Sequence, residues 1–166
     1  MIALRPVLEH EYDIAYTFIE EARAYQREQG FVQWTDKTPT LFDICKDIIE
    51  HRAYFITEDN EPLGYVCIRL DGDPIYDEIT AWTHTPYVAV HRVAIGDAAR
   101  GKGASRHLFR LIRELCLAHG IHAIRIDTHE DNLPMQRALE KFGFVRCGIV
   151  YITRAGERIA YHYHRS

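Results

Sequence analysis

The sequence predicts a single α/β domain in which helices cover both faces of a mixed β-sheet. The chain has 166 residues, a length that suits one domain with one substantial core. The expected order is strand, two helices, several strands, helix, strand, helix and strands, which is typical of a sheet with helices on both faces. Residues 87–95 are apolar on both faces, as expected of a central strand covered on two sides. We therefore treat residues 1–166 as one domain.

The first half of the chain is expected to contain two helices followed by strands. In the first helix, apolar residues recur at helical spacing until Gly30 ends the run. Thr40 has Asp43 three residues downstream, which is the spacing of a helix N-cap. The apolar residues of the helix that follows are expected to face inward, namely Leu41, Ile44, Ile48 and Ile49. The expected elements are a strand over 2–7, a helix over 9–28, a short helix after Thr40, strands near 53–57 and 62–70, and a weaker strand over 75–83.

The second half is expected to alternate between strands and helices. Gly120 and Gly143 end its two helices, and Asn132 caps the second one, with Pro134 in the first turn. The expected elements are a strand over 87–95, a helix over 103–119, a strand over 121–128, a helix over 133–142, and strands near 144–152 and 157–164.

Composition and charge exclude several classes of protein. A net charge of −4 argues against a chain built mainly to bind nucleic acid. No apolar run approaches the ~18–20 residues that span a bilayer, and the N-terminus shows no signal-peptide pattern. The four cysteines are scattered without a Cys-x-x-Cys pair, which favours reduced thiols in a cytoplasm. No histidine pair has ligand spacing beyond chance. We expect a cytoplasmic protein without a metal site, a membrane anchor or a nucleic-acid partner.

A glycine-rich turn after the apolar strand is the strongest functional signal. The turn spans Gly96 to Ser105 and opens a helix. A helix entered in this way presents unpaired N–H groups and the positive end of its dipole to an anion, above all to a phosphate. The spacing nearly matches a nucleotide-binding P-loop, but Gly103 replaces the Ser or Thr that binds magnesium. A turn that needs glycine for its backbone angles alone is the other alternative.

Two motifs resemble those of the GNAT N-acyltransferase superfamily. The turn residues Arg100-Gly-Lys-Gly-Ala-Ser105 resemble its acyl-CoA-binding signature, Arg/Gln-x-x-Gly-x-Gly/Ala, with serine where the family prefers Gly or Ala. Asn132, followed twelve residues later by Phe144, resembles its second block. The two blocks lie in the family's order with a strand between them, and together they cover about residues 87–146.

The resemblance implies a mostly antiparallel sheet with a central parallel strand pair that is splayed to hold acyl-CoA. It implies direct transfer of an acetyl group from acetyl-CoA to a primary amine of a small molecule or peptide, with the Val93 N–H as the donor to the developing oxyanion. Relatives are often homodimers, and the aromatic strand 161–164 is either an interface or an outer strand of the monomer. The residues implied in donor binding are Val93, Ala94, Ile95, Arg100, Gly101, Lys102, Gly103, Ala104, Ser105 and Asn132.

Two side chains are candidates for the catalytic base. His91 is the first, because an imidazole titrates near neutral pH and strand alternation places it on the same face as Val93. A hydrogen-bonded core histidine is the alternative reading of His91. Glu78 is the second, because an acidic residue near this cleft relays a proton through water in many relatives. A surface glutamate is its alternative reading.

The general acid is missing from its usual place. Leu139 stands where many family members carry the tyrosine that protonates the leaving thiolate. Tyr87 and Tyr76 are candidate replacements, unless they are packing aromatics. The same departure favours a second hypothesis, a non-catalytic acyl-CoA-binding or sensory module of this fold.

The acceptor site is expected between the first two helices and the carboxyl end of the second parallel strand. Gln33 and Trp34 lie in a polar loop and are candidates for one wall, although Trp34 is also suited to pin the loop to the core. Trp82 and His84 are candidates for the opposite wall. His129 follows the strand that ends near residue 128, where ligands gather in open sheets.

Overall fold

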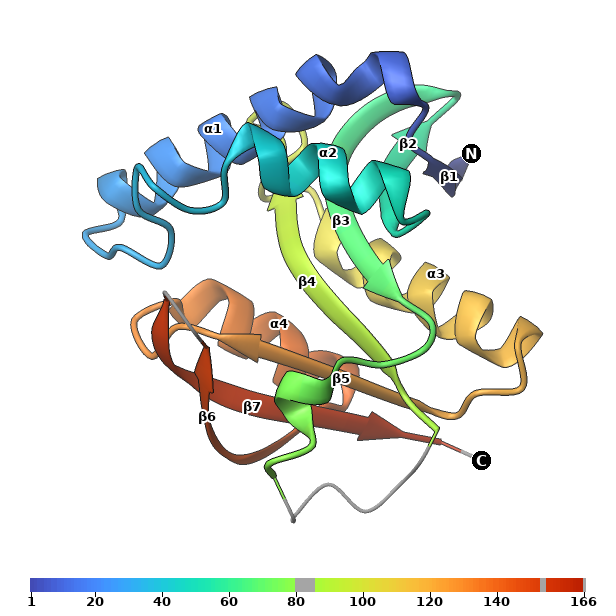
Figure 1. The fold of residues 1–166 in the computed structure, drawn as a ribbon, viewed down its shortest axis with the longest axis vertical. Coiled ribbons are helices and arrows are strands. Elements are labelled where there is room, and N and C mark those ends of the chain that lie inside the picture. The colour runs from blue at the N-terminus through green and yellow to red at the C-terminus, as the bar shows by residue number, and fades with distance from the viewer. Residues whose placement is uncertain (80–85, 153–154, 166) are drawn as a thin grey trace.

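Seven strands form one mixed sheet in the computed structural model, which describes residues 1–79, 86–152 and 155–165. The strand order is β1-β2-β3-β4-β5-β7-β6, in which β4 and β5 are parallel and the other neighbours are antiparallel (Figure 1). The strands are β1 (Ile2–Pro6), β2 (Ala53–Glu58), β3 (Glu61–Arg69), β4 (Val88–Ile95), β5 (Ala123–Thr128), β6 (Val145–Ile152) and β7 (Gly156–His164).

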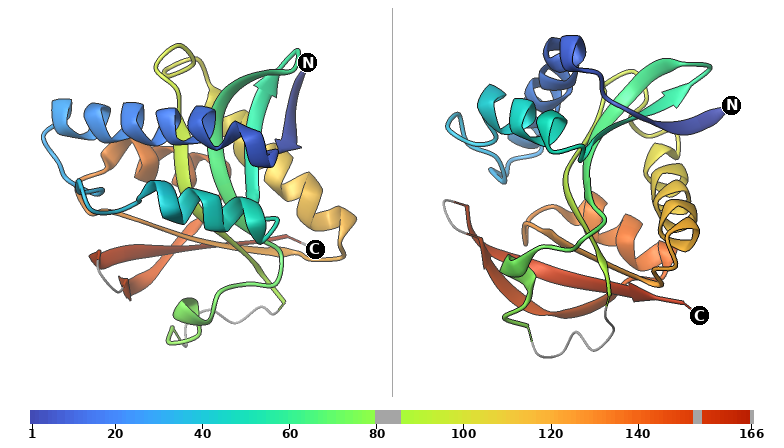
Figure 2. Two further views of the ribbon diagram at one scale, coloured as in Figure 1. Left: turned by 45° about the horizontal axis from the view of Figure 1, so that its top comes forward. Right: turned by 45° about the vertical axis from the view of Figure 1, so that its right-hand side comes forward.

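Helices cover both faces of the sheet. Two of them, α1 and α2, lie on one face of the β1–β4 half, and α3 and α4 lie on the opposite face (Figure 2). This arrangement confirms the predicted fold class, an α/β domain with a mixed sheet and a central parallel pair. The helices are α1 (Tyr12–Glu28), α2 (Leu41–Ile49), α3 (Ala104–Ala118) and α4 (Leu133–Phe142), and the short 3₁₀ turns are η1 (Glu9–Glu11) and η2 (Pro74–Tyr76).

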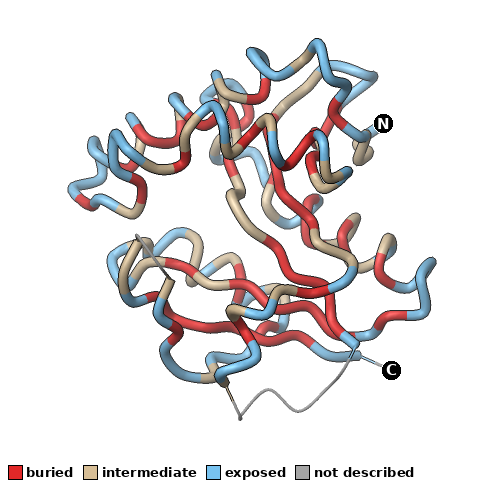
Figure 3. Tube along the Cα trace, in the orientation of Figure 1, coloured by how far each residue is buried: buried red, intermediate tan, exposed pale blue. Residues whose placement is uncertain are grey.

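Buried residues follow the strands and the inner faces of the helices (Figure 3). Leu108, Phe109 and Ile112 of α3 pack on one face of the sheet, whereas Ile19 of α1 and Ile44 of α2 pack on the other. Apolar burial on the two faces is the main stabilising contribution to such a layered fold. No helix in the described part of the chain is long and apolar enough to cross a membrane.

Two predictions about local structure are wrong. The described part of the segment 75–83 contains no strand, because the Asp73 carboxylate accepts a hydrogen bond from the Ile75 N–H and Pro74 begins the 3₁₀ turn η2; residues 80–83 lie outside the described residues. Ile49 and Leu41, both expected to face inward, are 67% and 41% exposed, because α2 turns Ile44 and Ile48 toward the core. Residue 49 lies about 100° further round the helix than residue 48.

The aromatic strand near the C-terminus is not an outer strand. It belongs to β7, which pairs with β5 on one side and β6 on the other. Tyr161 and Tyr163 point into the core with α3 and α4. Of the two alternatives left open by the sequence, the outer strand is therefore wrong.

Candidate functional site

The two parallel strands separate along their length. They pair only from Val88 opposite Ile124 to Val90 opposite Ile126, although β4 continues to Ile95 and β5 to Thr128. Beyond Val90, the edge of β4 that faces β5 has no ladder partner. Backbone N–H and C=O groups along such an edge are available to a ligand, because each needs a hydrogen-bond partner.

A β-bulge interrupts β4 at the point where the strands separate. The register with β3 shifts between Tyr65 and Cys67, and Arg92 has a φ of 53°. A φ in this region is unusual for a residue other than glycine. The bulge adds one residue to β4 relative to β3. The bulge leaves Val93 and Ile95 on the α3 side of the sheet and Ala94 on the α1 side.

The bulge corrects one prediction from the sequence. Simple alternation places His91 and Val93 on the same face, but the extra residue at Arg92 puts Val93 on the opposite face. His91 instead faces η2, where it contacts Tyr76 and Asp73. The two candidate groups therefore come from opposite sides of β4.

An ion pair from α2 holds the bulge. The Arg92 guanidinium donates from Nε to Asp47 Oδ2 at 2.8 Å and from Nη2 to Asp47 Oδ1 at 2.5 Å. The Tyr65 hydroxyl donates to the same carboxylate at 2.6 Å. Asp47 is buried, so these charge-assisted bonds compensate its desolvation and fix the backbone at residue 92.

The glycine-rich turn borders a cavity of about 370 Å³, which we call the turn cavity. Gly103 is the N-cap of α3 and has a φ of 78°, as does Gly101. A Cβ at either position would meet no atom within 4 Å. The glycines therefore satisfy the left-handed backbone and leave open space in front of the helix N-terminus, which suits a phosphate. The cavity is lined by Ala22, Tyr25, Gln26, Phe31, Val93, Ile95, Ala99, Arg100, Gly101, Gly103, Ala104, Ser105, Asn132, Pro134 and Met135.

Most of the residues expected to bind the donor line this cavity, but Lys102 and Ala94 do not, and the side chain of Arg100 is held by protein groups. The Arg100 guanidinium donates to the Asp97 carboxylate and to the Ile95 carbonyl, and it lies 3.9 Å from the centre of the Tyr25 ring. Its side chain thus braces the turn. Lys102 is exposed and does not line the cavity. The side chain of Ala94 packs on the far side of the sheet among residues of α1 and α2.

A second cavity of about 270 Å³ lies past the ends of β4 and β5, and we call it the strand-end cavity. Gln26, Val93, Asn132 and Met135 line both cavities, so the two spaces meet at Val93. The residues that line the strand-end cavity are Gln26, Gln33, Trp34, Thr38, Pro39, Arg69, Asp73, Ile75, Val90, His91, Arg92, Val93, Ile126, Asp127, Thr128, Asn132, Met135, Ile152, Ala155 and Arg158.

Four side chains form a hydrogen-bonded chain at the floor of the strand-end cavity. The Tyr76 hydroxyl donates to Asp127 Oδ2 and lies 3.4 Å from His91 Nδ1. The other ring nitrogen, Nε2, lies 2.8 Å from Asp73 Oδ2. Both nitrogens of His91 thus face protein groups. Asp127 is the carboxylate at the end of this series of hydrogen bonds that lies on β5, one of the two separating strands.

The pKa values of the two carboxylates shift in opposite directions. It raises the pKa of Asp127, although the His91 charge and the hydrogen bond from Tyr76 oppose the shift. Burial also acts to raise the pKa of Asp73, but the contact with His91 and the Ile75 N–H outweighs it and holds that pKa below its usual range. Burial and the nearby Asp127 raise the pKa of Tyr76, which keeps its hydroxyl a donor. Asp127 is therefore the carboxylate that accepts a proton more readily.

The loop between α1 and α2 closes over this site. Gln33 Oε1 accepts hydrogen bonds from Asn132 Nδ2 at 3.0 Å and from the His129 N–H at 3.3 Å. Asn132 also caps α4 through its Oδ1 and the Met135 N–H. Trp34 is buried at 8% exposure in the core of α1 and α2 and still lines the strand-end cavity. His129 stacks on Phe31 and lines neither cavity.

Other expected site residues lie away from the cavities. Glu78 is exposed and outside the strand-end cavity. Tyr87 is buried, and its hydroxyl donates to the Asp73 carbonyl at 2.6 Å. Leu139 is fully buried in the core beneath α3 and α4. Trp82 and His84 lie outside the described residues.

Asp127, Asp73 and Arg158 are the cavity residues that the sequence reasoning missed. Asp127 had a usable signal, because it is a carboxylate at the carboxyl end of a buried strand next to the glycine-turn strand. Asp73 sits in a turn and Arg158 in a C-terminal hairpin strand, and neither position carries a local pattern that points to this cavity.

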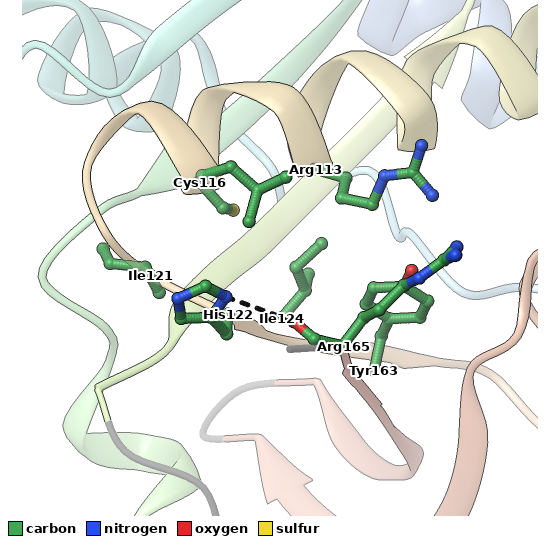
Figure 4. Close-up of a pocket in the computed structure, with 8 residues that line it drawn as sticks. Arg113, Cys116, Ile121, His122, Ile124, Tyr163 and Arg165 are labelled. Atoms are coloured by element: carbon green, nitrogen blue, oxygen red, sulfur yellow. Dashed lines mark hydrogen bonds between the residues drawn. The ribbon is translucent and has the colours of Figure 1, made fainter.

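A third cavity, of about 240 Å³, lies between the C-terminus of α3 and the end of β7 (Figure 4). It shares no lining residue with the other two. His122 Nδ1 lies 3.2 Å from the Arg165 carbonyl at its edge. Burial raises the pKa of the Cys116 thiol to about 12, so this thiol stays protonated at neutral pH. The chemistry is therefore concentrated where the turn cavity and the strand-end cavity meet.

Comparisons with known proteins identify the family to which the chain is similar. Residues 17–144 match the model of the acetyltransferase (GNAT) family. A GNAT-family acetyltransferase from Streptococcus agalactiae has a TM-score of 0.88 and 32% identity, over 99% of this chain and 96% of that chain. The aminoglycoside acetyltransferase AAC(6′)-Ib with coenzyme A has a TM-score of 0.75 and 24% identity, over 99% of this chain and 95% of that chain. The same values hold for its complex with coenzyme A and kanamycin. No curated protein sequence matches significantly.

Proposed function

Because this chain belongs to the GNAT acetyltransferase family, we propose that it transfers the acetyl group of acetyl-CoA to a primary amine of a small molecule or peptide. The meeting of the two cavities at Val93 carries this proposal. One cavity ends at a helix N-terminus suited to phosphate, and the other contains carboxylates suited to an ammonium group. The crystallisation of AAC(6′)-Ib with both coenzyme A and kanamycin supports a two-substrate arrangement.

The turn cavity would hold the donor. The space in front of α3 is open at Gly101 and Gly103, and backbone N–H groups at the start of this helix would bind the pyrophosphate; the Lys102 N–H instead donates to the Ala99 carbonyl. The unpaired edge of β4 would hydrogen-bond the pantetheine arm. In this arrangement Arg100 supports the turn through Asp97 and Ile95 rather than binding phosphate.

The β4 bulge would polarise the thioester. Val93 follows the bulge and lies where both cavities meet, so its N–H is our candidate donor to the carbonyl oxygen that gains negative charge. The ion pair between Arg92 and Asp47 fixes the backbone at this point. A preorganised donor needs no rearrangement during the reaction, which is the main source of its catalytic effect.

Asp127 would bind the ammonium group of the acceptor and take up its proton. Its raised pKa makes it a better base than an ordinary aspartate, and Tyr76 orients it by donating to Oδ2. His91, held between Asp73 and Tyr76, would limit the rise in the pKa of Asp127. The thiol formed from the leaving thiolate has a pKa of about 8.5, so water can protonate the thiolate without a dedicated acid. The buried Leu139 is then compatible with catalysis.

A coupled assay tests the proposal. Purified protein is incubated with acetyl-CoA and a panel of amines, and free thiol is measured. We expect acetyl-CoA to raise the melting temperature and thiol release to depend on an amine, and we expect both effects to be lost in Gly103→Glu. Stabilisation without amine-dependent release would instead favour the non-catalytic acyl-CoA-binding module, which the leucine at position 139 also favours.

We also propose a cytoplasmic location. The four cysteines, all within the described part of the chain, form no disulfide. Reduced thiols are usual in that compartment.

A further inference from the structure

The charged side chains around the strand-end cavity are not evenly compensated. Its lining contains the ionisable residues Arg69, Asp73, His91, Arg92, Asp127 and Arg158. Arg92 is paired with Asp47 of α2, as described above. Asp73 lies between two nitrogen partners, with Arg69 Nη1 at 3.5 Å and His91 Nε2 at 2.8 Å. These four lining groups therefore have their charges satisfied within the protein.

The two remaining groups, Asp127 and Arg158, form no ion pair with any described residue, although their opposite charges influence each other. No cationic nitrogen of the described residues lies within ion-pair distance of Asp127. Its carboxylate accepts a hydrogen bond from the neutral Tyr76 hydroxyl. Arg158 is buried, and its Nη1 and Nη2 donate to the carbonyls of Glu157 and Gln33, each at 2.8 Å. Within the described chain, no carboxylate lies within 4 Å of this guanidinium.

The topology directs both groups to one face. Asp127 of β5 lies opposite Ala160 of the neighbouring strand β7, and Arg158 precedes Ala160 by two residues. Residues two apart on a strand share a face. Ala160 packs with Tyr76, which is the partner of Asp127, so all of them lie on the cavity side of the sheet. The cavity thus presents one carboxylate and one guanidinium, on adjacent strands, to the same ligand.

Building on the function proposed above, we propose that the acceptor is an amino-carboxylate, such as an amino acid, whose ammonium group lies at Asp127 and whose carboxylate lies at Arg158. A guanidinium has five N–H donors in a planar fork, and two suffice for the bonds to the Glu157 and Gln33 carbonyls. The rest match the oxygens of a carboxylate. Burial lowers the pKa of Arg158 and the charge of Asp127 opposes this shift, so a ligand carboxylate at this position would oppose it further. An acceptor with several amines would place a second cation against Arg158.

Matched substrate pairs test this assignment. Thiol release from acetyl-CoA is measured with each L-amino acid and with the corresponding α-carboxamide, which keeps the amine and loses only the negative charge. We expect kcat/KM for the best amino acid to exceed that of its amide about 10- to 100-fold, as for one charge-assisted contact. The amine of the amide is less basic, so a larger share of it is unprotonated and reactive at neutral pH. This difference favours the amide, so it cannot produce the expected preference for the amino acid. Kanamycin is the polycationic comparison and is expected to be poorer than the amino acid.

Variants separate recognition from folding. In Arg158→Gln we expect the acid-to-amide ratio to fall toward one, and in Arg158→Lys to be partly retained. Arg110→Gln, on the exposed face of α3, is the control and should keep the wild-type ratio. Should Arg158→Gln fail to fold, the wild-type ratio and the lysine variant still decide the question.

Each failure has its own signature. Equal use of amino acids and amides, or a preference for kanamycin, would overturn the amino-carboxylate assignment and leave acetyl transfer intact. Absence of thiol release with every amine, despite stabilisation by acetyl-CoA, would overturn the proposed function and this assignment with it.

Discussion

At the scale of single residues, Asp127 has opposite effects on folding and on the proposed catalysis. Its pKa is higher in the folded protein than in the unfolded chain, so the folded state binds the proton more tightly. The contribution of Asp127 to the free energy of unfolding therefore falls as the pH rises through this raised pKa. The ionised carboxylate opposes folding, while it is the form that the reaction needs.

We expect Asp127→Asn to lower amine-dependent thiol release by a factor of about 100 or more while leaving the melting temperature at pH 7 unchanged or higher. The asparagine Oδ1 can still accept the Tyr76 hydroxyl. The matched control is Glu78→Gln, because Glu78 is exposed and outside the cavity, and it should keep wild-type activity. Loss of activity in Glu78→Gln, with normal activity in Asp127→Asn, would show that Asp127 is not the base and would favour Glu78, the second candidate from the sequence.

The same residues show how far sequence reasoning reaches. The glycine turn was predicted from a local pattern that needs no tertiary information, whereas the role of Val93 was implied by the resemblance to the GNAT superfamily. The face of His91 was predicted wrongly, because the bulge at Arg92 depends on Asp47, which lies 45 residues away in sequence. Strand alternation describes a regular strand and contains no signal for an ion pair from another helix.

At the scale of elements, the junction of α2 and β4 depends on that ion pair. We expect Asp47→Ala to lower the free energy of unfolding by about 3 kcal/mol, because the Arg92 guanidinium loses its carboxylate in a largely buried setting. Urea denaturation measures the change. Lys46→Ala is the control on the same helix, since Lys46 is exposed and its pair with Glu50 at 3.8 Å should contribute less than about 0.5 kcal/mol. Similar effects of both substitutions would contradict the role of the pair.

The start of α3 yields a second prediction at this scale. Gly103→Ala introduces a Cβ at a φ of 78° and into the open space before the helix, so we expect a loss of about 1 kcal/mol in stability and about tenfold weaker binding of acetyl-CoA. Gly120→Ala is the matched control at the other end of the helix, with a φ of 70° and equally open surroundings. It should lose similar stability and keep its affinity in isothermal titration calorimetry. Equal affinity losses would place the donor away from the turn.

Most elements of the fold followed from periodicity and capping residues. Thr40 with Asp43, and Asn132 with Pro134, predicted the starts of α2 and α4 because those side chains act within one turn. The segment 75–83 failed because the hydrogen bond from the Ile75 N–H to Asp73 and the proline at 74 favour a 3₁₀ turn over the extended chain. Local signals thus predicted elements, whereas the partners of the strand-end cavity required the assembled sheet.

At the scale of the whole molecule, the sheet consists of two halves, β1–β4 and β5-β7-β6, joined in the ladder by only the short parallel pairing of β4 and β5. Across the strand-end cavity, the Gln33 loop adds a second connection, because Gln33 accepts from Asn132 and Arg158 donates to the Gln33 carbonyl. A ligand between the splayed strands would link the halves a third time. Donor binding should therefore stabilise the molecule as a unit.

We expect acetyl-CoA at a hundred times its Kd to contribute about 2.7 kcal/mol, which corresponds to a rise in melting temperature of about 5–10 °C for a chain of this size. Hydrogen exchange should slow in residues 91–95 and 101–105, since those backbone groups would face the donor. Gly103→Glu should remove both effects. The rise in melting temperature could instead persist in Gly103→Glu and disappear in Arg113→Ala. That result would place the ligand in the cavity between α3 and β7, and the ligand would then not link the two halves of the sheet.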